Sequence, residues 1–71
     1  MSYAEQALAY MKEHGSITSW EAIQAHHNTR LSESILLLRN QGHKIDTLWE
    51  TKNGKRYGRY VLMDALFGDD E

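Results

Sequence analysis

Residues 44–62 read KIDTLWETKNGKRYGRYVL, and this stretch decides the fold. Apolar and polar side chains alternate on both sides of Asn53-Gly54, which is the period of a β-strand. Asn-Gly between two alternating segments indicates a hairpin, because both residues tolerate the positive φ angles of a type I′ turn. The stretch therefore predicts two antiparallel strands, one beginning near residue 43 and the other over residues 56–62, joined at Asn53-Gly54.

Two helical segments open the chain. Apolar residues recur at helical spacing before Gly15, which predicts a helix over residues 3–14 that ends at this glycine. A short connector with strand character follows. Thr18 and Glu21 have the spacing of a capping box, so a second helix is predicted over residues 19–26. Its predicted apolar side consists of Trp20, Ala22 and Ile23.

A third helix is predicted over residues 30–41. Asn28 and Thr29 suit both the turn before it and a helix N-cap, and Gly42 ends it. At about 100° per residue, its predicted inner face consists of Leu31, Ser34, Ile35 and Leu38. Its predicted outer face consists of Glu33, Leu36 and Asn40, with Leu37 at the border.

The order of these elements indicates the fold class. Two helices joined by a short turn form a helix-turn-helix. A lone two-stranded hairpin is marginally stable in water, so the hairpin must pack on the helices. We therefore predict an α+β domain over residues 1–63, with a three-helix helix-turn-helix core and a two-stranded β-hairpin wing. An acidic C-terminal tail is predicted over residues 64–71.

Charge is distributed unevenly along the chain. The 71 residues carry a formal net charge of −2, but residues 27–63 carry seven Lys and Arg against three Asp and Glu. The segments before and after this region are acidic. Because the local field matters more than net charge for a polyanionic ligand, the basic middle predicts a surface that contacts nucleic acid.

The composition argues against several classes of function. The sequence has no Cys, so disulfides and thiolate metal sites are excluded. No apolar run reaches the roughly 18 residues of a membrane span, and the N-terminal residues do not resemble a signal peptide, so a cytoplasmic protein is expected. The four histidines lack the spacing of a metal site, and no nucleophile–base arrangement or glycine-rich phosphate loop is present. We expect no enzyme, metal, cofactor or small-molecule substrate.

Four stretches of the sequence together resemble a known family. They are Gly15-Ser16-Ile17-Thr18, Ile35 with Leu38-Arg39 ahead of Gly42, Gly42-His43-Lys44-Ile45, and NGKRYGRYVL from Asn53 to Leu62. Residues 3–62 thus resemble the small winged helix-turn-helix domains common in phages and prophages. The resemblance implies a winged-helix fold, DNA binding in a bacterial host cell, and no enzymatic activity. The sequence departs from the family at Ser34, where a basic residue is usual, and at Leu36 and Leu37, where polar residues are usual.

Two functions are compatible with these patterns. In the first, the chain binds double-stranded DNA as a phage or prophage transcriptional regulator or DNA-architecture factor. The third helix enters the major groove, and the wing lies on the phosphate backbone. The predicted DNA contacts are Asn28, Thr29, Arg30, Ser32, Glu33, Lys52, Lys55, Arg56 and Arg59.

In the second function, the domain binds a host or phage protein, or a second copy of itself, with little or no sequence-specific DNA binding. Leu36 and Leu37 on the third helix then form an apolar interaction surface. The alternative for these two residues is contact with the other helices or with the tail. The predicted protein-contact residues are Leu36, Leu37, Leu66 and Phe67.

Overall fold

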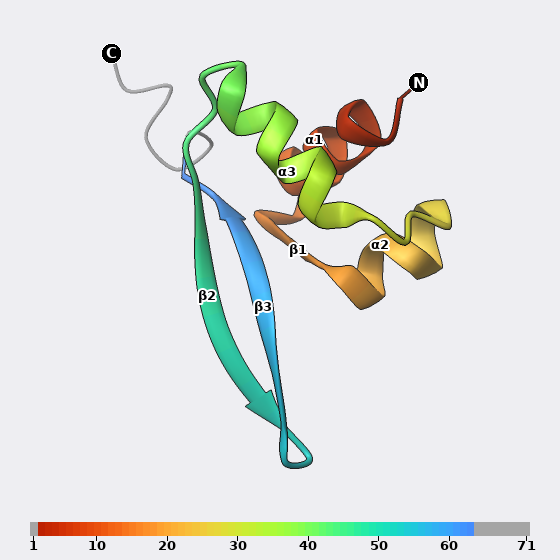
Figure 1. Ribbon diagram of the computed structural model, residues 1–71, viewed down its shortest axis with the longest axis vertical. Helices are drawn as coiled ribbons and strands as arrows, with labels where there is room; N and C mark the ends of the chain where they lie inside the picture. Colours follow the sequence, from red (N-terminus) through yellow and green to blue (C-terminus); the bar gives the residue numbers. More distant parts are fainter. Residues whose placement is uncertain (1, 64–71) are drawn as a thin grey trace.

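Three helices and a small antiparallel sheet make up the computed structural model, which describes residues 2–63 (Figure 1). In chain order the elements are α1 (Tyr3–His14), β1 (Ser16–Thr18), α2 (Ser19–His26), α3 (Leu31–Asn40), β2 (Ile45–Lys52) and β3 (Lys55–Leu62). This order confirms the predicted helix-turn-helix core with a hairpin wing. The predicted tail over residues 64–71, with Leu66 and Phe67, lies outside the described residues.

Short local interactions set the ends of the first two helices. Ser2 with Glu5 and Thr18 with Glu21 each form a capping box at the start of α1 and α2. In each, the hydroxyl accepts from the glutamate backbone N–H, and the carboxylate accepts from the N-cap backbone N–H. Gly15 follows α1 with a φ of 91°, which confirms the predicted left-handed helix end.

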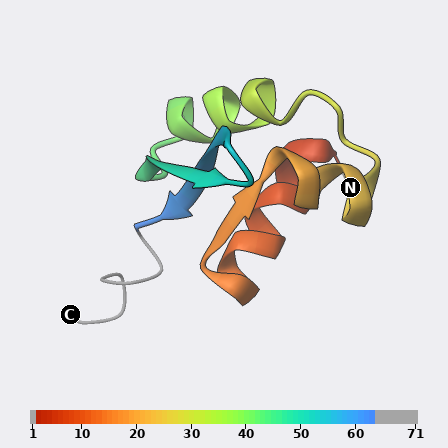
Figure 2. The ribbon, with the colours of Figure 1, turned by 90° about the horizontal axis from the view of Figure 1, so that it is seen from below.

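The central strand of the sheet is β3, which pairs with β1 on one side and β2 on the other. The β1 pairing covers three residues, from Ser16 opposite Val61 to Thr18 opposite Arg59. The β2 pairing runs the full length of the hairpin to the turn, where Asn53 and Gly54 have φ angles of 54° and 79° as predicted. Past β1 the hairpin is a two-stranded ribbon that projects away from the helices (Figure 1), and the view from below looks nearly along this ribbon (Figure 2). We call the β2–β3 hairpin the wing.

The hydrophobic core joins the helices to the inner end of the sheet. Its buried residues are Ala4, Ala7, Met11, Ile17, Ala22, Leu31, Ile35, Leu38, Ile45 and Leu62. Ser34 is buried as well, so the predicted inner face of α3 is confirmed. The wing contributes only its innermost pair, Ile45 and Leu62, to these buried residues. The outer part of the wing is therefore free to serve a surface role.

The predicted place of Trp20 on the apolar side of α2 is wrong. Trp20 is 65% exposed, and α2 buries only Ala22 completely. Trp20 lies in the first turn of this short helix, which faces the wing rather than the core. The helical spacing of Trp20 and Ile23 suggested a wider apolar face than α2 has.

Candidate nucleic-acid interface

Lys52 and Lys55 form the last residue pair of the wing, directly opposite each other across the turn. Like charges opposite one another destabilise a strand pair. Both side chains are exposed, and within residues 2–63 neither they nor Arg56 form an ion pair with a carboxylate. The wing tip therefore carries positive charge that the described part of the chain leaves unneutralised.

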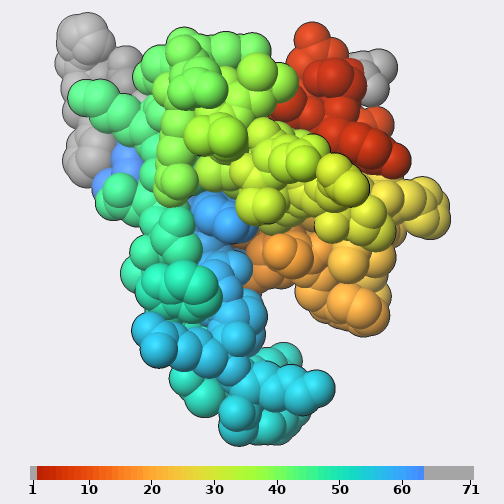
Figure 3. Space-filling model, in the orientation of Figure 1, coloured from red at the N-terminus to blue at the C-terminus, as the bar shows by residue number. Residues whose placement is uncertain are grey.

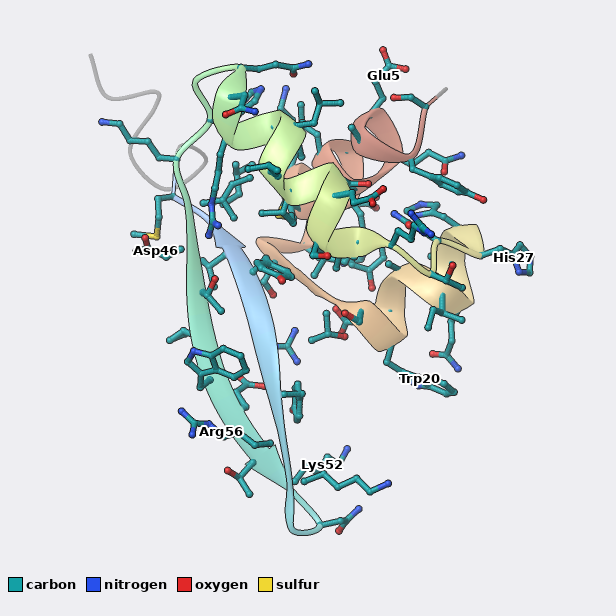
Figure 4. The ribbon with its side chains drawn as sticks, in the orientation of Figure 1. Glu5, Trp20, His27, Asp46, Lys52 and Arg56 are labelled. Atoms are coloured by element: carbon teal, nitrogen blue, oxygen red, sulfur yellow. The ribbon has the colours of Figure 1, made fainter. Side chains whose placement is uncertain are left out.

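Arg56 and Trp49 lie together on one face of the wing. The guanidinium carbon of Arg56 is 5.1 Å from the centroid of the Trp49 ring, within the range of a cation–π interaction. Trp49 is opposite Gly58, and a Cβ atom at Gly58 would lie 3.6 Å from the indole ring. The indole thus lies close over the strand and supports the Arg56 side chain. The guanidinium group of Arg56 stays on the surface and faces solvent (Figure 4).

Arg59 has a different environment from the three cations near the tip. Its Nε donates to Glu50 Oε1 at 3.1 Å, and its Nη1 lies 3.4 Å from Glu21 Oε2 and 3.2 Å from Ser16 Oγ. The fold brings Glu21 of α2 next to β3, so Arg59 has a second acidic partner besides Glu50. The Arg59 side chain is only 26% exposed and connects the wing to α2.

Hydrogen bonds tune the ionisation of this cluster. Hydrogen bonds that Tyr57 and Arg59 donate to the Glu50 carboxylate hold the pKa of Glu50 below its usual 4.5, and the bond from Tyr57 has the larger effect. The same contact with Glu50 raises the pKa of the Tyr57 hydroxyl. Burial acts to lower the pKa of Arg59, but the hydrogen bond to Glu50 and the charge of Glu21 outweigh it, so this pKa is raised. The cluster therefore remains an ionised carboxylate–guanidinium network at neutral pH.

This network predicts a specific acid sensitivity. Because the folded-state pKa of Glu50 lies below the unfolded value, its ionisation stabilises the fold above about pH 4.5 and this stability is lost as the pH falls through the folded pKa. We expect the Tm advantage of the wild type over Glu50→Gln to shrink below pH 4.5 in circular-dichroism melts. Tyr57→Phe removes the hydrogen bond that lowers the pKa of Glu50 most. The Tm of this variant should therefore fall less than the wild-type Tm as the pH drops. A Tm difference that stays constant across this pH range would contradict the assignment.

The N-terminal end of α3 is exposed and polar. Thr29, Arg30, Ser32 and Glu33 all lie on the surface. Arg30 Nη1 donates to Glu33 Oε2 at 3.0 Å, and both side chains are largely solvent-exposed. An exposed pair of this kind contributes little stability, so a phosphate or base can replace Glu33 as the partner of Arg30. Among the described residues, no side-chain hydrogen bond caps α3 at its N-cap residue, which leaves this end open to an anion.

Asn28 is structural in this arrangement. It is 1% exposed; its Oδ1 accepts from the Arg30 backbone N–H at 2.9 Å and its Nδ2 donates to Ser34 Oγ at 3.3 Å. The expectation that Asn28 or Thr29 caps α3 is wrong, since the N-cap residue is Arg30. Because its polar atoms bond within the domain, Asn28 holds the turn between α2 and α3.

The outer face of α3 carries apolar side chains. Leu36 is 60% exposed and Leu37 is 48% exposed, so neither belongs to the core of residues 2–63. Leu37 borders a shallow pocket that Tyr3 and Arg30 also line. Contact of these leucines with the tail lies outside the described residues. The apolar surface that a protein partner would need is present on α3.

Within residues 2–63, no three His, Cys, Asp or Glu side chains gather closely enough to hold a metal ion. In the same range, no helix has the length and apolar character to cross a bilayer.

Comparison with known proteins agrees with the geometry. A family model described as a winged helix-turn-helix domain matches residues 2–65. A search of curated proteins returns no match, and neither does a search of solved structures.

Proposed function

Because this chain belongs to the winged helix-turn-helix domain family, we propose that it binds double-stranded DNA. The N-terminal end of α3 enters the major groove, and the wing tip lies on the phosphate backbone. We place the protein in the cytoplasm of a bacterial host as a phage or prophage transcriptional regulator or DNA-architecture factor. Its role is binding rather than catalysis.

The observation that carries this proposal is the unneutralised charge at the wing tip. Lys52, Lys55 and Arg56 have no carboxylate partner within residues 2–63, and the fold presents them on a projecting ribbon. Phosphate contacts dominate protein–DNA affinity, and exposed Lys and Arg supply them. The proposed contacts are Thr29, Arg30, Ser32, Lys52, Lys55 and Arg56. Glu33 pairs with Arg30 in the free protein, and DNA takes the place of Glu33 in the complex. Asn28 and Arg59 position the elements that carry this surface.

A single module of this size buries only about 600–1,000 Å² on DNA. Useful affinity then requires a second copy on an adjacent half-site or a protein partner. We propose that the chain acts in such an assembly.

The test is the salt dependence of binding to a mixed-sequence duplex, measured by fluorescence anisotropy. Four phosphate contacts, from Arg30 and the three wing-tip cations, give a slope of log K against log salt of about −3.6. No binding at low salt, or a slope near zero, would overturn the proposal.

A second candidate function follows from the exposure of Leu36 and Leu37. In it, the outer face of α3 binds a protein partner or another copy of the chain. We expect Leu36→Asp to abolish self-association in analytical ultracentrifugation while leaving the Tm unchanged, because Leu36 is exposed. Asn40→Asp adds the same charge to exposed α3 without removing apolar surface, and should self-associate normally. If the wild-type protein is monomeric in this experiment, the self-association hypothesis is overturned. If Leu36→Asp unfolds the domain, Leu36 has a structural role.

A further inference from the structure

A groove separates the first turn of α2 from the outer part of the wing (Figure 3). Its volume is ≈ 670 Å³. Sites for small organic ligands span roughly 300–1,000 Å³, so the groove has room for one or two nucleotides of a single strand. A double helix is far too wide to enter it.

Trp20 forms the α2 wall of this groove. Its indole is 65% exposed, in a position where the helical pattern of the sequence predicts burial. Positions where a well-formed fold departs from its own apolar pattern are commonly functional ones. Trp20 and Lys52 extend from opposite sides of the gap between α2 and the wing (Figure 4). An exposed indole across from a lysine suits a base that stacks on the ring while its phosphate meets the ammonium group.

Charge on the opposite wall fits the same ligand. Lys52 and Lys55 line the groove from the wing, together with the partly buried ring of Tyr57. Neither lysine has a carboxylate partner within residues 2–63. Arg59 also lines the groove, but Glu21 and Glu50 already engage its guanidinium. The available positive charge is therefore at the wing tip, and the aromatic surface is on both walls.

We propose that this groove binds one or two unpaired nucleotides of a DNA strand, with a base stacked on Trp20 and the phosphates on Lys52 and Lys55. Single-strand sites combine such basic walls with aromatic platforms, because every base has a face that stacks. The inference deepens the proposed function, on which it rests, by naming the substrate as duplex DNA with an adjoining unpaired segment.

The test compares a blunt duplex with the same duplex carrying a short oligothymidine tail. Stacking of one base corresponds to an affinity gain of roughly 5- to 150-fold for the tailed DNA. We expect Trp20→Ala to remove this gain and to leave the affinity for blunt duplex unchanged. Trp20→Phe, with a smaller ring, should keep part of it. Trp49→Ala is the matched control, because Trp49 is similarly exposed but does not line the groove, and it should retain the gain.

A second measurement separates this inference from the proposed function. In the Trp49→Phe protein Trp20 is the only indole, and free oligothymidine should quench its fluorescence. Equal affinity for blunt and tailed duplex, without quenching, would overturn the groove assignment even if duplex binding is strong. Quenching without any duplex binding would instead overturn the proposed function and keep the groove as a single-strand site. A Trp20→Ala protein that keeps the full gain would also contradict the assignment.

Discussion

Replacing Lys52, Lys55 and Arg56 together with glutamine should weaken duplex binding by roughly 10²–10³-fold at about 0.1 M salt. Each lost phosphate contact makes the slope of log K against log salt shallower by about 0.9, so the three together change it by about 2.7. The two proteins should therefore approach the same affinity as salt rises from about 0.1 to 1 M. Anisotropy titrations across this range give both numbers. The Tm should change little, because the loss of the contact between Arg56 and Trp49 is offset by the removal of two facing lysines that repel each other.

The matched control for the wing-tip variant is Lys12→Gln. Lys12 is exposed in the last turn of α1, so the substitution removes one cation outside α3 and the wing. Its effect on the slope should be close to zero. If Lys12→Gln lowers log K by about a third as much as the triple variant does, every cation counts equally, binding depends on net charge alone and the wing has no specific part in it.

Asn28→Ala should lower the free energy of unfolding by about 1–3 kcal/mol. The substitution leaves the Arg30 backbone N–H and the buried Ser34 hydroxyl without their partner. In a domain of this size each 1 kcal/mol of lost stability lowers the Tm by about 4–8 °C. The Tm measured by circular dichroism should therefore fall by roughly 5–20 °C. Asn28→Asp retains an acceptor for Arg30 and should lose less.

Thr29→Ala separates the structural role of Asn28 from a contact with DNA. Thr29 is the exposed neighbour in the same turn, so its removal should leave the Tm nearly unchanged and act on DNA affinity alone. An Asn28→Ala protein with the wild-type Tm and weak DNA binding would show that Asn28 contacts DNA through its side chain. Its burial would then have to change on binding.

The parts of the fold that the sequence predicts correctly depend on neighbours along the chain. The positive φ angles at Asn53-Gly54, the capping box of Thr18 and the buried side of α3 each follow from residues within one or two turns. Helical and strand periods are local as well, which explains why the element bounds agree closely. The wing-tip lysines are also local, since they flank the turn itself.

The parts that sequence reasoning misses depend on tertiary contacts. Glu21 and Arg59 are 38 positions apart, and only the packing of α2 beside β3 brings their charges together. Asn28 bonds to Ser34 of α3 once the helices have packed together. Trp20 is exposed because the packing of α2 turns its first turn toward the wing and away from the core. A short polar residue in a turn has the same appearance in the sequence whether it binds a ligand or supports the turn.

The three-residue pairing between β1 and β3 has a consequence for how such a domain changes over evolution. Within residues 2–63, the inner half of the wing is tied to the body through that pairing, through Ile45 and Leu62, and through the contacts of Arg59 with Glu21 and Ser16. Inserting or deleting two residues in each strand changes the reach of the wing and keeps every side chain on its face, whereas a single-residue change exchanges the faces. The distance between α3 and the wing tip is thus a variable that can drift in steps of two without disturbing the core.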